Sequence, residues 1–206
     1  MAISLASEAV DTYALAGLTA FSVDIRWDAT AKKGAGGKNT KHPRNWQSAG
    51  GFKCDSWNSV GINTGLSNLV IIDIDDDQRL ADFLREAEAR HVDVATRRAK
   101  SGSSIGGHFY FRAVHGKPPL KSTDNVALWG ITDARTGKSS IDVKAAGGLI
   151  YAPPSSYMKE GTLRKYDWID ESAPIAYLPE ALYDALEKQG GAVHANAPLR
   201  NRRNAE

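Results

Sequence analysis

Two aspartates separated by a single residue follow the most hydrophobic segment of the chain. Asp73 and Asp75 end the run LVIIDID, residues 69–75. Because residues i and i+2 of a β-strand point to the same face, both carboxylates are expected to project together. Adjacent carboxylates raise each other's pKa unless a cation lies between them, and Mg²⁺ is commonly held by one or two carboxylates plus substrate phosphates. The pair predicts a divalent metal site, although a strand running into an acidic helix start, with Asp76 and Asp77, would give the same pattern.

A glycine-serine segment precedes the second candidate. Residues 101–107 read SGSSIGG, and His108 opens the strand HFYFRAV. Backbone N–H groups of small residues can approach a phosphate closely, and serine hydroxyls and an imidazole can add further donors. The segment does not match GxxxxGK[ST] and is therefore not a P-loop. A plain hairpin connection with an incidental histidine is the alternative.

A third carboxylate lies further along the chain, in SSIDVKA, residues 139–145. Strand alternation places Ile141 and Val143 on one face and Asp142 and Lys144 on the other. An aspartate beside a lysine suits a further metal ligand next to a triphosphate contact. An exposed, ion-paired strand face is the alternative.

The charges of the chain are distributed unevenly, although the net charge of the 206 residues is only +2. Residues 26–53 and residues 97–121 each carry a net charge of +6, whereas residues 73–93 carry −5. Two basic segments on either side of an acidic one favour a polyanionic partner near a carboxylate cluster, but solvated loops and a charged helix face fit equally well. Lysines and an aromatic ring suit contact with a single nucleic-acid strand. The candidates in the first basic segment are Lys32, Lys33, Lys38 and Trp46.

The overall composition narrows the class of protein. With 42% hydrophobic and 24% charged residues, the chain is an ordinary globular protein rather than a disordered or fibrous one. No apolar run approaches the roughly eighteen residues of a membrane span, and Glu8 and Asp11 interrupt the N-terminal segment, which makes a poor signal peptide. The single cysteine, Cys54, excludes an internal disulfide and a cysteine-rich zinc site. No zinc and no membrane are therefore expected, and a cytoplasmic location is the default.

The elements that must position these residues are a mixture of strands and helices, which predicts one α/β or α+β domain. A tail of small and polar residues is expected after the last helix. The sequence predicts helices at 4–16, 78–90 and 180–188, strands at 18–25, 60–65, 69–75, 108–114, 139–145, 148–154 and 166–169, and long loops at 28–53 and 115–139.

Two of these expectations are specific enough to test. The strands 139–145 and 148–154 are expected to form a hairpin or to be neighbours around Gly147 and Gly148. Asp77 is expected to cap the helix 78–90. The side chains expected on the inward face of that helix are Leu80, Phe83, Leu84 and Ala87.

In their order along the chain, these pieces resemble the prim-pol domain of the archaeo-eukaryotic primase superfamily, the kind found in plasmid and phage replication proteins. The resemblance covers roughly residues 5–170. An apolar strand ending in Asp-x-Asp matches residues 70–75, a small residue two before a histidine matches Gly106 and His108, and an apolar residue followed by Asp matches residues 141–142. Further matches are Asn58, Gly61, Ile62 and Gly65, then Lys41, Pro43 and Trp46 of a Lys-x-Pro…Trp loop, and the stretch Gly147, Gly148 and Ala152 to Ser155.

One position departs from the family pattern. Family members often carry serine where this chain has Gly106. Nearby serines that could take over the hydroxyl role are Ser101, Ser103 and Ser104.

The resemblance implies a DNA primase and DNA-directed polymerase that transfers nucleotides from dNTPs or NTPs onto a primer on a single-stranded DNA template. It implies a catalytic core over residues 1–188 with a mixed sheet, one part like an RNA-recognition motif, and flanking helices. Residues 189–206 would be a disordered tail or the start of a linker to a further domain, and a helicase domain or partner would be expected, in a phage or plasmid replication protein.

The same resemblance assigns residues to roles. Asp73, Asp75 and Asp142 would be catalytic and would hold two Mg²⁺ or Mn²⁺ ions. The residues that would bind the nucleotide are His108, Ser101, Ser104, Gly106, Lys100, Lys144 and Lys41.

Two other functions stay open from the residues alone. The chain could be a non-catalytic nucleic-acid-binding scaffold of the same fold, which the intact carboxylates and His108 count against. It could also be a metal-dependent phosphoesterase, since the same carboxylates would serve that reaction.

Overall fold

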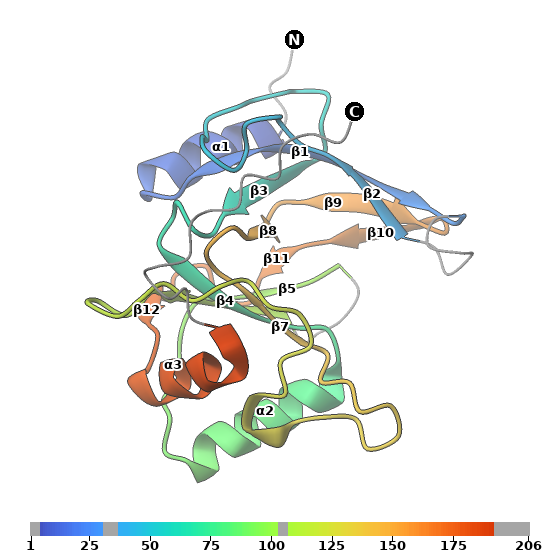
Figure 1. The fold of residues 1–206 in the computed structure, drawn as a ribbon. Helices are drawn as coiled ribbons and strands as arrows, with labels where there is room; N and C mark the ends of the chain where they lie inside the picture. Colours follow the sequence, from blue (N-terminus) through green and yellow to red (C-terminus); the bar gives the residue numbers. More distant parts are fainter. Residues whose placement is uncertain (1–4, 31–36, 103–106, 192–206) are drawn as a thin grey trace, which may run out of the picture.

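The computed structural model describes residues 5–30, 37–102 and 107–191. Within these ranges the chain forms three β-sheets and three α-helices, with α1 at one end of the molecule and α2 and α3 at the other (Figure 1). This mixture confirms the predicted α+β class. The elements are α1 Leu5–Leu15, β1 Ala20–Asp28, β2 Gly37–Lys41, β3 Ser59–Asn63, β4 Leu69–Ile74, α2 Asp77–Ala89, β5 Arg98–Lys100, β6 Gly107–Arg112, the short 3₁₀ turn η1 Leu128–Gly130, β7 Ile141–Lys144, β8 Leu149–Ala152, β9 Ser156–Lys159, β10 Thr162–Lys165, β11 Asp167–Trp168, β12 Ala176–Tyr177, α3 Glu180–Leu186 and the π-helical turn η2 Glu187–Gly191.

The largest sheet runs through the middle of the molecule in the order β11-β5-β6-β4-β7, with β12 paired in parallel to β6. Its strand β4 is apolar along almost its whole length because both of its faces are covered. Val70, Ile72 and Ile74 pack with α2 and α3, whereas Leu69 and Ile71 pack with α1 and β3 on the other face. Residues 69–74 therefore form a buried strand, as the sequence predicts, and Asp75 lies exposed just beyond its end.

The second sheet has four antiparallel strands in the order β2-β1-β3-β8. Alternate residues of β1, namely Phe21, Val23 and Ile25, enter a third apolar cluster with Tyr157 and Tyr166. Tyr157 belongs to the separate hairpin β9–β10, and Tyr166 follows that hairpin directly. This cluster joins the four-stranded sheet to the hairpin.

The predicted pairing of 139–145 with 148–154 is wrong. β7 pairs with β4 in the central sheet, whereas β8 pairs with β3 in the four-stranded sheet. The crossing needs two glycines, because Gly147 has φ +76° and a Cβ at Gly148 would lie 2.4 Å from Oγ of Ser122. The short Gly-Gly segment passes the chain from one sheet to the other instead of turning it back.

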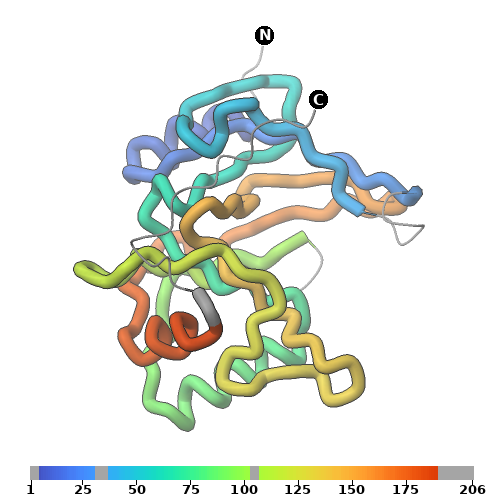
Figure 2. The backbone as a smooth tube through the Cα atoms, in the orientation of Figure 1, coloured from blue at the N-terminus to red at the C-terminus, as the bar shows by residue number. Residues whose placement is uncertain are grey.

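The predicted loop 28–53 contains a strand that the sequence does not reveal. β2 pairs with β1, and Lys38 lies opposite Trp27 in the register. Because β2 is an edge strand with mostly exposed side chains, GKNTK carries none of the apolar alternation by which strands are recognised. By contrast, the long loop 115–139 is confirmed apart from η1, and Figure 2 shows this segment, yellow-green to yellow, crossing the view toward the lower right.

Helix α2 differs from its prediction at two positions. Asp76, not Asp77, is the capping residue, and its side chain accepts a hydrogen bond from the backbone N–H of Arg79. Leu84 is 38% exposed and does not face the core, whereas Phe83 and Ala87 are buried as expected.

The C-terminal helix is shorter than predicted, because α3 ends at Leu186 and η2 continues to Gly191. Most of the predicted tail, residues 192–206, lies outside the described residues. Among the residues that the structure describes, none of the helices combines the length and the apolar character needed to cross a bilayer.

Candidate active site

The centre of the site lies on three neighbouring strands of the central sheet. Asp73 on β4 is directly opposite His108 on β6 and directly opposite Asp142 on β7. Residues opposite one another in antiparallel strands share a face of the sheet, so the three side chains emerge side by side. Three residues that come from separate sequence motifs are thereby brought together.

Asp73 and His108 form a close, buried pair. Nε2 of His108 lies 3.3 Å from Oδ1 of Asp73, and the two side chains are 3% and 13% exposed. The contact is not aligned as a hydrogen bond, and within the described residues neither Oδ1 of Asp73 nor Nδ1 of His108 has a hydrogen-bond partner. Burial opposes ionisation of Asp73, but the nearby His108 outweighs it, with smaller contributions from two lysines, and the pKa of Asp73 is held below its ordinary value.

Asp75 has the opposite electrostatic environment. It follows the last residue of β4, and its backbone N–H donates to the carbonyl of Ser140, 3.1 Å away. Burial raises the pKa of Asp75, and the negative charges of Asp73 and Asp142 raise it further. The repulsion expected from the sequence therefore acts at Asp75, whereas at Asp73 the neighbouring His108 offsets the cost of burial.

Asp142 is held by its own surroundings. One carboxylate oxygen accepts a hydrogen bond from the backbone N–H of Asn125 at 2.9 Å, and the other lies 2.9 Å from Nζ of Lys144. Nζ of Lys144 is also 2.7 Å from the carboxylate of Asp124. Burial alone would lower the pKa of Lys144, but hydrogen bonds to the two carboxylates raise it, so the side chain stays charged. Asp142 and Lys144 share the polar face of β7, as predicted.

A lysine from the other sheet reaches the same carboxylates. Nζ of Lys38, on β2, donates to the hydroxyl of Tyr166 at 2.7 Å. Its charge acts on both Asp73 and Asp75, where it favours the ionised forms. The sequence makes Lys38 a candidate for template binding, and in the structure its ammonium group lies at Tyr166, whose ring is 5.7 Å from that of His108.

Three tyrosines surround the ammonium group of Lys38. Nζ lies 5.7 Å from the ring centre of Tyr151, 5.3 Å from that of Tyr157 and 5.4 Å from that of Tyr166. The ring of Tyr166 is also 5.7 Å from that of His108. Burial raises the pKa of Tyr166 well above its ordinary value, so its hydroxyl stays neutral and can accept from the ammonium group.

None of these tyrosines is a candidate on sequence grounds. They lie more than a hundred residues after Lys38, and none of them belongs to a motif that suggests metal binding, phosphate binding or catalysis. The only available signal is the alternation of SYMK and TLRK around Glu160-Gly161, which marks a hairpin near the APPS stretch.

The glycine before His108 has a clear structural reason. Gly107 has φ +87°, and a Cβ at this position would lie 2.0 Å from the carbonyl oxygen of Ala99 on β5. Only glycine allows β6 to begin this close to β5. Glycine at position 107 is therefore a requirement of strand pairing, which fixes where His108 emerges, whereas Gly106, the small residue of the motif, lies outside the described residues.

The other predicted site residues are spread more widely. Lys41 is on β2 but, being three residues after Lys38, lies on the opposite face of the strand. Lys100 pairs with Asp167 at 3.2 Å, and Ser101 is buried. Trp46 packs against Phe21 and His42 and is only partly exposed. Ser104, Gly106, Lys32 and Lys33 lie outside the described residues.

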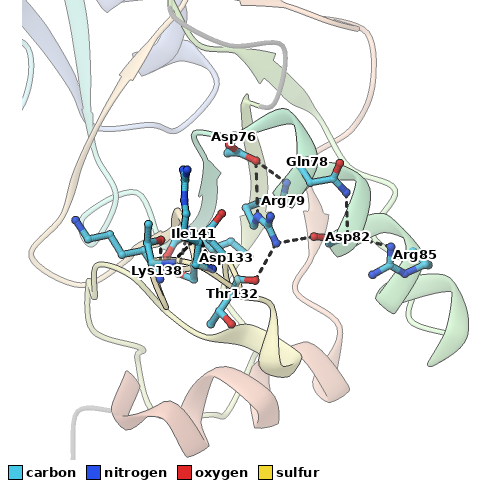
Figure 3. A network of polar contacts seen from close by, with 12 residues as sticks. Asp76, Gln78, Arg79, Asp82, Arg85, Thr132, Asp133, Lys138 and Ile141 are labelled. Carbon is cyan, nitrogen blue, oxygen red and sulfur yellow. Dashed lines mark hydrogen bonds and ion pairs between the residues drawn. The ribbon is translucent and has the colours of Figure 1, made fainter.

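A polar network fixes the segment that leads into β7. Figure 3 shows Arg79 of α2 pointing toward both Asp82 and the 132–138 segment. Its guanidinium donates to the carboxylate of Asp82 at 2.8 Å and to the carbonyl of Thr132 at 2.9 Å. This segment precedes β7, which carries Asp142. The network therefore helps to fix the chain that leads to Asp142.

The chemistry of these side chains suits a hard divalent cation. Within the described ranges, no three histidine, cysteine, aspartate or glutamate side chains are yet gathered closely enough to form a metal site. However, Oδ1 of Asp73 is a buried carboxylate oxygen without a hydrogen bond, which leaves it available to a cation. At Asp75, burial is the larger cause of the raised pKa, and the charges of Asp73 and Asp142 add negative potential at the same place. Carboxylate oxygens are the ligands that Mg²⁺ and Mn²⁺ prefer, so the chemistry of these residues fits such an ion.

Comparison with known proteins identifies a family. No curated protein sequence matches the chain. A protein-family model described as Prim-Pol, the N-terminal domain of bifunctional DNA primase/polymerase, matches residues 12–181, which include every strand and helix of the carboxylate cluster described above. The chain therefore belongs to the Prim-Pol family.

Proposed function

We propose that this chain is a template-directed nucleotidyltransferase, a DNA primase and DNA polymerase that adds dNTPs or NTPs to a growing strand. One observation carries the proposal: the register of the central sheet puts Asp73 between His108 and Asp142 in a member of the Prim-Pol family. Asp73, Asp75 and Asp142 would hold two Mg²⁺ or Mn²⁺ ions, which when bound lower the charge of the phosphates and stabilise the leaving pyrophosphate.

The protein groups around this cluster suit a triphosphate. His108 can donate from an imidazole nitrogen to a phosphate oxygen, and Lys144 offers a charged group on the same face of the sheet. Gly107 ends the glycine-serine segment and brings its backbone close to β5. Lys100 and Ser101 lie at the start of that segment, and with Ser104 and Gly106 they remain our candidates for further phosphate contacts.

The reaction is an in-line displacement at the α-phosphorus. The 3′-hydroxyl loses its proton to solvent and its oxygen forms a new bond to the α-phosphorus. The bond between this phosphorus and the oxygen that bridges it to the β-phosphate breaks, so that pyrophosphate leaves with the electron pair. The protein's contribution is to align the two reactants and to surround the phosphates with fixed donors.

Single-stranded DNA is the proposed template. The basic segment 26–53 and Trp46 are our candidates for contact with the template or primer. A helicase domain or partner, and a phage or plasmid setting, are parts of the proposal that rest on the sequence resemblance alone.

The test is a primer-extension and de novo priming assay with labelled dNTPs or NTPs, with Mg²⁺ and Mn²⁺ compared. The wild-type protein should extend the primer and release pyrophosphate. Asp73→Ala and Asp75→Ala should each reduce incorporation by at least about 10³-fold, since each removes a ligand of the ions on which the reaction depends. Circular dichroism of both variants confirms that the fold is retained.

The same assay separates the two alternatives. A phosphoesterase would release nucleoside monophosphate without strand growth. A binding scaffold would retain DNA binding but would show no stabilisation by dNTP with metal, and incorporation by Asp73→Ala at the wild-type rate would refute the proposed carboxylate roles.

A further inference from the structure

The position of Lys38 is unusual for a surface lysine on an edge strand. The residue as a whole is exposed, yet its Nζ is held by the hydroxyl of Tyr166 and lies within 5.7 Å of three aromatic ring centres. Aromatic rings attract an ammonium group through the negative potential of their faces, and a hydroxyl acceptor fixes its direction. The flexible side chain of Lys38 is thereby confined to one place.

That place is beside the carboxylates of the other sheet. The hydroxyl of Tyr166 accepts from Nζ of Lys38, the ring of Tyr166 is 5.7 Å from that of His108, and Nε2 of His108 lies 3.3 Å from Oδ1 of Asp73. At this position the charge of Lys38 favours the ionised forms of both Asp73 and Asp75. Lys144 does not duplicate this role at Asp75, because it is bonded to Asp124 and Asp142. Lys38 is thus a cation from the four-stranded sheet that compensates negative charge on the central sheet.

We propose that Lys38 is a resident counter-cation of the carboxylate cluster, and that the triphosphate of an incoming nucleotide takes over this ammonium group when it binds. The inference rests on the proposed function, because it assumes that the cluster receives a metal-bound nucleotide. A divalent ion arriving alone must compete with the ammonium group for the same negative potential. A triphosphate gives that group a more highly charged partner, so the ion enters more favourably together with the nucleotide.

This arrangement predicts effects of opposite sign when the charge is removed. Lys38→Met keeps the length and apolar stem of the side chain and deletes the ammonium group. The affinity for Mn²⁺ alone should rise by about 3- to 10-fold, because a competing positive charge is gone. The affinity for inorganic tripolyphosphate in the absence of metal should fall by about 10-fold, because a charged donor is lost.

Lys159→Met is the matched control. Nζ of Lys159 also lies over an aromatic ring, 4.3 Å from the centre of Trp27, whereas the rings around Nζ of Lys38 are those of the three tyrosines beside the site. Both affinities of this variant should equal those of the wild-type protein.

The experiment measures free Mn²⁺ by electron paramagnetic resonance during titration and tripolyphosphate binding by calorimetry, on the wild type and both variants. A thermal melt confirms that each variant is folded. If either affinity of Lys38→Met is unchanged or moves in the other direction, the inference is overturned. Equal shifts in Lys159→Met would also overturn it, since they would indicate a general effect of surface charge.

Primer extension by the wild-type protein separates this inference from the proposed function. If the wild type extends primers while Lys38→Met binds both probes as the wild type does, only the role of Lys38 fails. If the two opposite shifts appear but the wild type makes no product, the counter-cation role stands and the polymerase function fails.

Discussion

The two aspartates at the end of β4 differ in environment although one residue separates them. Asp73 is largely buried and lies against His108, so its ionised form is favoured in the folded protein. Asp75 is more exposed, but it receives the repulsion of two other carboxylates. The alternation of a strand places both on one face, yet the partners contributed by β6 and β7 make their electrostatics unequal.

This inequality predicts opposite effects on stability in metal-free buffer. A carboxyl whose folded pKa is raised destabilises the fold once it is ionised, so Asp75→Asn should raise the melting temperature at pH 7. Because Asp75 is partly exposed, screening limits the gain to less than about 1 kcal/mol, or about 1–3 °C. A carboxyl whose folded pKa is lowered stabilises the fold above its unfolded pKa, so Asp73→Asn should lower the melting temperature by about 3–6 °C.

Differential scanning calorimetry in the presence of EDTA makes this measurement. The Asp75 effect should fade as the pH falls through its raised folded pKa toward the ordinary value of about 3.9, whereas the Asp73 effect should fade only below about 3.9, as the pH approaches its lowered folded pKa. Two shifts of the same sign would contradict the assigned electrostatics.

At the scale of single residues, local patterns identify only part of the site. Asp73, His108 and Asp142 are recognisable because each sits in a strand whose alternation or preceding glycines are visible in the sequence. The three tyrosines around Nζ of Lys38 cannot be recognised in this way, because they come from β8, from β9 and from the residue before β11. Contacts between such distant segments depend on how the two sheets meet, which no local pattern encodes.

Among the secondary-structure elements, burial determines which ones the sequence reveals. β4 and β6 lie in the middle of the central sheet, and their apolar runs are unmistakable. β2 and β10 carry mainly exposed side chains, so their sequences resemble loops. The Gly147-Gly148 segment, expected to turn the chain back, instead transfers it between sheets, because strand pairing is chosen by distant partners.

The junction between α2 and the 132–138 segment carries a prediction at the element scale (Figure 3). Arg79→Ala should destabilise the protein by about 1–3 kcal/mol, or about 3–10 °C, because it removes the bond to Thr132 and leaves the buried Asp82 with weaker compensation. The measurement is urea or thermal unfolding monitored by circular dichroism.

Arg85→Ala is the control for this prediction. Arg85 pairs with the same carboxylate at 2.9 Å but is 64% exposed, whereas the side chain of Arg79 is 15% exposed. An exposed ion pair contributes at most about 1 kcal/mol, so Arg85→Ala should have the smaller effect. Equal losses in the two variants would show that the bond to Thr132 does not matter.

For the molecule as a whole, the two basic segments are less alike than their equal charges suggest. Most cations of residues 97–121 are engaged within the protein: Arg97 with the carbonyl of Ala173, Arg98 over the ring of Phe109, Lys100 with Asp167, Arg112 with the carbonyl of Ser67 and Lys117 with Asp184. In residues 26–53, Lys53 pairs with Asp11, and Nζ of Lys38 donates to the hydroxyl of Tyr166. Lys41 and Arg44 are exposed and make no ion pair within the described residues. These two cations are therefore the better placed for an external polyanion.

We expect Lys41 and Arg44 to contribute to binding of single-stranded DNA. Each cation that neutralises a phosphate contributes about −0.7 to the slope of log K against log salt on a single strand. The double variant Lys41→Gln/Arg44→Gln should therefore make the slope shallower by about 1.4, measured by fluorescence anisotropy of a labelled oligonucleotide across a salt series. Lys38 is kept in this variant, because its loss would disturb the carboxylate cluster.

Lys53→Gln provides the comparison, because the charge of Lys53 is already compensated by Asp11 at 3.1 Å. Its slope should stay within about 0.3 of the wild-type value, less than half of one phosphate contact. A double variant whose slope equals that of the wild type would move the DNA contact away from this edge of the four-stranded sheet. The residues to test next would then be those of 97–121, whose internal bonds would have to open for DNA to reach them.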